Sequence, residues 1–78
     1  MDQLSKHELV IWEEALQLYN KSVSLDLEHD AHAIFRLAVE AAKRLTIRYQ
    51  HPLALQLAKM LTGIWCDRWY AVNGKAAA

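Results

Sequence analysis

The chain has 78 residues, enough for one small domain, and its 54% hydrophobic and 23% charged residues exclude the polar, highly charged composition of a disordered segment. Its single cysteine, Cys66, excludes an internal disulfide and a cysteine-rich zinc site. The formal net charge of +0, together with the lack of a long apolar run and of a signal-peptide pattern, predicts a cytoplasmic protein without a membrane partner.

The charges are unevenly distributed along the chain. Residues 1–30 carry seven acidic and two basic side chains, whereas residues 31–78 carry seven basic and two acidic ones. We expect these two segments to complement one another across helices or subunits, with a modest energy for each exposed pair.

The first predicted helix spans about residues 6–22. Ser5 and Glu8 have the spacing of a capping box, which places the helix start near Lys6. Apolar residues then recur at spacings of three and four, which is typical of a buried helix face. The predicted buried face contains Leu9, Trp12, Leu16, Tyr19 and Val23, and Val10, Ile11, Ala15 and Leu18 widen it.

The second predicted helix spans about residues 27–49. Asp26 and Asp30 are alternative N-caps. Pro52 separates this helix from the next one, because it disfavours helical geometry at His51 and suits a first helical position. The predicted apolar line contains Leu27, Ala31, Ile34, Ala38, Ala41 or Ala42, Leu45 and Tyr49.

The third predicted helix spans about residues 52–73, where Asn73 and Gly74 supply a stop signal. Residues 75–78 are expected to form a frayed tail. The short connections favour antiparallel neighbours. The sequence therefore predicts an all-α fold in one domain over residues 1–74, a three-helix up-down-up bundle.

The aromatic residues and the width of the apolar surface suggest two kinds of site. Trp12, Phe35, Trp65 and Trp69 are candidates for the core. The third helix is apolar over more than one stripe, so we expect a second copy to cover the excess and form a homodimer. Candidates for the dimer or partner interface are Ile64, Tyr70 and Leu55.

Two other kinds of site are alternatives. Arg36, Lys43, Arg44 and Arg48 form a basic strip on the second helix that could contact nucleic-acid phosphates. Glu28 and His32 share an i, i+4 face and are weak metal-ligand candidates, although neither an H-E-x-x-H motif nor paired E-x-x-H motifs accompany them. The acidic first turn of a helix is the simpler explanation of these residues.

No catalytic or cofactor-binding motif occurs in the sequence. A phosphate loop, a nucleophile elbow and a dinucleotide fingerprint are all missing. The sequence therefore predicts a non-enzymatic helical interaction module without a cofactor, such as an adaptor, inhibitor or accessory regulator. Its expected partners are a second copy of itself and an unidentified protein.

Overall fold

The polypeptide forms three helices joined by two short connections. The computed structural model describes residues 5–74, which form α1 (Lys6–Val23), α2 (Ala31–Ala41), the π-helical segment η1 (Ala42–Ile47) and α3 (Pro52–Asn73). η1 continues directly from α2. No strand occurs within residues 5–74, so the all-α prediction is confirmed for them. The frayed tail predicted for residues 75–78 lies outside the described residues, as do residues 1–4 of the predicted domain.

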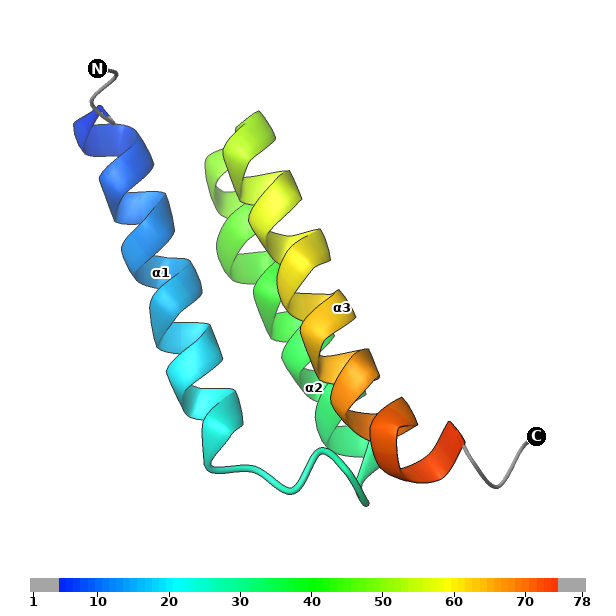
Figure 1. Cartoon of the computed structure of the whole chain (residues 1–78). Helices are drawn as coiled ribbons and strands as arrows, with labels where there is room; N and C mark the ends of the chain where they lie inside the picture. Colours follow the sequence, from blue (N-terminus) through cyan, green and yellow to red (C-terminus); the bar gives the residue numbers. More distant parts are fainter. Residues whose placement is uncertain (1–4, 75–78) are drawn as a thin grey trace.

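The helices lie side by side, with α3 packed against α1 and along α2 and η1 (Figure 1). The start of α1 lies at the same end of the molecule as the turn between η1 and α3. The linker 24–30 lies at the opposite end, beside the last turns of α3. This arrangement brings residues 22–28 close to residues 68–73, although they are distant in the sequence.

Side-chain caps set the first two helix starts. The predicted capping box of α1 is present: the Glu8 N–H donates to Ser5 Oγ at 3.2 Å, and the Ser5 N–H donates to Glu8 Oε1 at 3.0 Å. α2 begins later than the predicted residue 27. Asp30 caps it, because Asp30 Oδ1 accepts from the N–H groups of His32 and Ala33 at 3.0 and 3.3 Å. Residues 24–30 therefore form a linker, in which Leu27 is nevertheless fully buried.

The predicted bounds of the third helix agree with those of α3. Pro52 occupies its first position, and the Leu53 N–H donates to Nδ1 of His51, the N-cap, at 3.0 Å. The preceding residue, Gln50, has a φ of 49°, so the chain turns sharply through the left-handed region between η1 and α3.

The core is formed by one side of the wide apolar face predicted for α1. Ile11, Ala15 and Leu18 on that side are buried, whereas the prediction is wrong for the central line of the face, whose five residues are all exposed. Both sets recur at spacings of three and four, so periodicity alone allows either face to point inward. The observed face carries the smaller Ala15 at its middle, which permits close helix packing. The core is completed by Leu27, Ala33, Leu37, Ala41, Leu45, Ala54, Leu57, Ala58, Leu61 and Trp65.

The π-helical segment keeps the second helix in register with the core. Across α2 and η1, the buried residues follow one another at intervals of four, at Ala33, Leu37, Ala41 and Leu45. In a regular α-helix of 3.6 residues per turn, each such interval rotates the side chain by about 40°. The wider turns of η1 offset this rotation over the last interval, from Ala41 to Leu45, so Leu45 still faces the core. The predicted apolar line is wrong for Ala31, which is the first residue of α2 and is exposed.

The four aromatic core candidates have different environments. Trp65 is fully buried, and Trp69 is half-buried. The core prediction is wrong for Trp12 and Phe35, which are 41% and 68% exposed, because α1 and α2 turn other residues inward. Nε1 of Trp65 has no hydrogen-bond acceptor within residues 5–74. Trp65 therefore contributes to folding through apolar burial alone.

Candidate docking surface

An open apolar groove runs between α1 and α3. We call it the α1–α3 groove. Its floor is formed by residues with little solvent exposure, and its walls by exposed apolar side chains. The hollow has a volume of about 170 Å³, and no charged side chain lines it. The lining residues are Trp12, Ala15, Leu16, Tyr19, Leu57, Met60, Leu61 and Ile64.

Helical spacing explains how the sequence builds this groove. Trp12, Leu16 and Tyr19 are separated by four and three residues, so they form one stripe on α1. On α3, Met60 and Ile64 are four residues apart and form the opposite wall. Leu16 is 57% exposed, which is far more than a core leucine.

The apolar surface extends beyond the groove itself. Leu9 and Val23 continue the α1 stripe in both directions and are also exposed. A second depression adjoins the groove toward the start of α3, lined by Trp12, Leu53, Gln56, Leu57, Lys59 and Met60. A contiguous exposed apolar surface of this kind is typical of a site for protein docking.

The other edge of α1 is polar and is closed by ion pairs. Glu14 contacts Arg44 of η1 at 3.5 Å, and Lys21 contacts Glu40 of α2 at 2.9 Å. Arg44 also contacts Glu40 at 3.1 Å, which joins the pairs into one network. α1 therefore has a buried face, a polar edge held against α2 and η1, and an apolar edge open to solvent along the groove.

Arg68 of α3 fixes the linker between α1 and α2. Its Nε and Nη2 donate to the two carboxylate oxygens of Glu28 at 3.0 and 3.2 Å. Nη1 donates to the carbonyl of Ser22 at 2.9 Å, and Nη2 to that of Leu25 at 3.1 Å. Asn73 adds a hydrogen bond to the Glu28 carbonyl. Sequence reasoning missed this contact, because nothing in the local pattern pairs Arg68 with a residue forty positions away.

The same contact changes the interpretation of the metal-ligand candidates. The hydrogen bonds from Arg68 hold the pKa of Glu28 below its ordinary value of 4.5. The carboxylate is thus occupied by a guanidinium, and His32 is exposed in the first turn of α2. Within residues 5–74, no group of three or more potential ligands converges. In the structure, the Glu28 carboxylate holds Arg68 and so helps to fix the linker against α3.

The three predicted interface residues lie in three separate places. Ile64 lines the α1–α3 groove. Tyr70 is 61% exposed and lies edge-on to Trp69, with ring centroids 5.2 Å apart, beside a depression that Cys66 also lines. Leu55 lines a depression near the turn between η1 and α3. The structure does not bring these residues into one surface.

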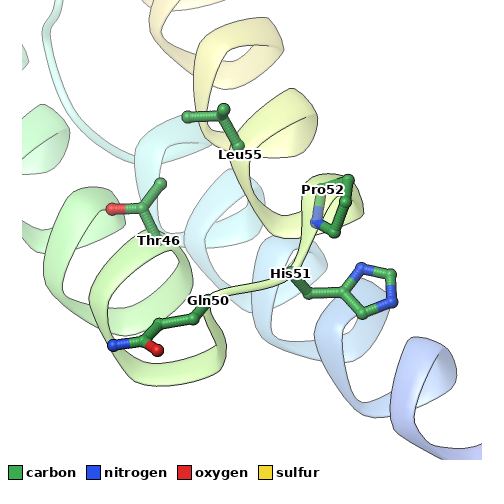
Figure 2. A pocket seen from close by; sticks show the side chains of 5 residues that line it. All are labelled: Thr46, Gln50, His51, Pro52 and Leu55. Atoms are coloured by element: carbon green, nitrogen blue, oxygen red, sulfur yellow. The ribbon is translucent and has the colours of Figure 1, made fainter.

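The depression at Leu55 is also lined by Thr46, Gln50, His51 and Pro52. Figure 2 shows Thr46 and Leu55 pointing toward one another across it, while the ring of His51 turns away toward α1. The His51 ring lies 5.6 Å from that of His7, and the Thr46 hydroxyl donates to the Ala42 carbonyl at 2.6 Å. The His51 ring is thus directed elsewhere and the Thr46 hydroxyl is already bonded, whereas the Gln50 side chain forms no hydrogen bond within residues 5–74.

The basic strip is partly neutralised. Arg44 is held by the carboxylates described above, and Arg36 lies 3.8 Å from Asp30. The Arg44–Glu14 and Arg36–Asp30 pairs join the acidic residues 1–30 to the basic residues 31–78, as the charge distribution predicted, whereas Arg44–Glu40 lies within residues 31–78. Among the described residues, Lys43 and Arg48 form no ion pair with a carboxylate, and Arg48 lies over the ring of Tyr49.

The chain matches no protein-family model, no curated protein and no solved structure. Among the helices of residues 5–74, none has the length and apolar character needed to cross a membrane.

Proposed function

We propose that this chain is a non-enzymatic helical interaction module that docks with other protein surfaces through the α1–α3 groove. In this proposal, the three helices form an up-down-up bundle that a second copy completes. The exposed α1 stripe carries the argument, because Trp12, Leu16 and Tyr19 face solvent at helical spacing beside the apolar wall of α3. Aromatic and large aliphatic anchors in a central hollow are the usual source of binding energy in protein interfaces.

The proposed role is that of an adaptor, inhibitor or accessory regulator. The dimer would leave other surfaces free for an unidentified protein partner. Tyr70 supports this part of the proposal, because it is exposed and held edge-on against Trp69 outside the groove. A phenol ring with an accessible hydroxyl suits a protein interface.

A matched pair of variants tests docking through the groove. Leu16→Asp places a charge in the groove, whereas Phe35→Asp places the same charge at an exposed apolar position on α2 outside it. Sedimentation equilibrium of the wild-type chain should give about twice the monomer mass of 9.0 kDa at micromolar concentration. We expect Leu16→Asp to be monomeric and Phe35→Asp to remain dimeric, with the helical circular-dichroism signal retained in both.

The outcome can contradict the proposal in two ways. A wild-type chain that sediments as a monomer at high concentration argues against the homodimer. Equal loss of association in Leu16→Asp and Phe35→Asp, with both variants folded, argues against the groove as the docking surface.

Nucleic-acid binding is the second candidate function, because Lys43 and Arg48 form no ion pair with a carboxylate in the described part of the chain. Phosphate contacts would make binding strongly dependent on salt. The combined change Lys43→Gln and Arg48→Gln should then abolish retention on DNA or RNA at low salt. If the wild-type chain is not retained, this candidate is rejected.

A further inference from the structure

Two oppositely charged side chains lie beyond the outer rims of the α1–α3 groove, and the basic one, Lys59, also lines a depression between α3 and α2. Glu13 follows Trp12 on α1, and Lys59 precedes Met60 on α3, so each lies about 100° around its helix from a groove residue. Both are exposed, and neither forms an ion pair within residues 5–74. Trp12 and Lys59 line the same depression, which places the acidic and basic positions at a similar level along the groove.

Two-fold symmetry makes these charges informative. In a two-fold interface, if residue i of one copy contacts residue j of the other, then j also contacts i. Packing α1 over α3 of a second copy would bring Glu13 beside Lys59 of the partner subunit, and would do so twice. Packing α1 over the partner's α1 would instead place two Glu13 carboxylates along one contact.

We propose that a second copy of this chain occupies the α1–α3 groove as a two-fold dimer in which α1 of each copy lies over α3 of the other. This inference rests on the proposed docking function and specifies its geometry. The apolar stripe of α1 covers Met60 and Ile64 of the partner subunit, and the Glu13–Lys59 pairs fix the alignment. Apolar burial supplies most of the affinity, while charge complementarity selects the orientation.

Asp67, the acidic residue of α3, does not weaken the preference of Glu13 for the position beside Lys59. Asp67 is exposed, but it lies eight residues beyond Lys59 on α3. At 1.5 Å per residue the separation along the helix is about 12 Å. This distance exceeds the Debye length of about 8 Å at physiological ionic strength, so Asp67 has little effect on the Glu13 position.

Charge reversal tests the orientation directly. Dimer dissociation constants would be measured by sedimentation equilibrium for the wild type, Glu13→Lys, Lys59→Glu and the double variant. Each single reversal should weaken dimerisation about tenfold, because it replaces two attractions with two repulsions. The double variant should return to within about threefold of the wild type, because both pairs are restored with exchanged signs.

An equimolar mixture of the two single variants provides a second readout. A dimer containing one copy of each has an attractive pair at both contacts, so the mixture should associate more tightly than either variant alone. The difference between single and double variants should shrink in 1 M salt, where the Debye length is about 3 Å. Both positions are exposed, so circular dichroism should show unchanged helicity in every variant.

The possible results distinguish a failure of the crossed orientation from a failure of docking through the α1–α3 groove. If Leu16→Asp abolishes a wild-type dimer but the double variant is no tighter than the single ones, the groove still docks a second copy and the crossed orientation is wrong. If the wild-type chain is monomeric, both the orientation and the homodimer are overturned.

Discussion

The two edges of α1 differ in whether their side chains find partners within the same chain. Along the edge that faces α2 and η1, Glu14 and Lys21 meet oppositely charged partners within the same chain. Along the edge that faces α3, Trp12 and Leu16 remain exposed beside apolar neighbours. Along α1, the polar edge is therefore closed by partners within the same chain, whereas the apolar edge is left open, as expected of a surface that needs a partner.

The largest expected effect separates the core from the open groove. Trp65→Ala should lower the free energy of unfolding by about 3–5 kcal/mol, because it empties a fully buried aromatic site. Leu16→Ala, at a position more than half exposed, should change it by no more than about 0.5 kcal/mol in the monomer. Urea unfolding followed by circular dichroism at low chain concentration measures both values.

A milder variant refines this prediction. Trp65→Phe removes the indole nitrogen that has no acceptor among the described residues and keeps an aromatic ring, so it should cost less than Trp65→Ala. If Trp65→Ala and Leu16→Ala lowered the free energy of unfolding equally, Leu16 would contribute as much to the stability of the monomer as a core residue does.

A smaller loss of stability is expected at the Glu28–Arg68 contact as the pH falls. Arg68 lowers the pKa of Glu28 in the folded state below 4.5. A lowered folded pKa means that the stabilisation is fully present above about pH 4.5 and is lost as the pH falls through the folded value. Glu28→Gln should therefore flatten the decrease in melting temperature between about pH 5 and pH 3.

Glu8 provides the control for this measurement. Hydrogen bonds from the backbone and side chain of Ser5 lower the pKa of Glu8, so its contribution has the same sign. Glu8→Gln should remove only its own share of the acid dependence. A Glu28→Gln profile parallel to that of the wild type would mean that the Arg68 contact does not stabilise the fold.

The smallest expected effect concerns the polar edge itself. A double-mutant cycle with Glu14→Gln and Arg44→Gln should give a coupling of about 0.2–1 kcal/mol, because Arg44 is partly solvated. The cycle would be measured by urea unfolding of the four proteins. A coupling energy above about 2 kcal/mol would indicate a buried ion-pair network. The polar edge of α1 would then stabilise the fold strongly, unlike the open apolar edge.

Local signals in the sequence were sufficient for much of the fold. The capping box at Ser5 and Glu8 fixed the start of α1, and Pro52 fixed the start of α3, because both act within a single helical turn. The start of α2 was ambiguous between two aspartates four residues apart, since each offers the same capping oxygen. In the structure Asp30 is the cap, since its Oδ1 accepts from the N–H groups of His32 and Ala33, and Leu27 is buried in the linker before it.

The α1–α3 groove could not be predicted from neighbouring residues alone. The periodicity of α1 identified Trp12, Leu16 and Tyr19 as a stripe, but not the direction in which that stripe points. Neighbouring residues in the sequence predicted the three helices, the cap of α1 and the apolar stripes, since each depends on contacts within a few residues. Tertiary structure alone decided that Ile11, Ala15 and Leu18 face the core. It also decided that a π-helical segment keeps Leu45 inward and that Arg68 binds Glu28, because these outcomes depend on how close helices distant in the sequence can approach.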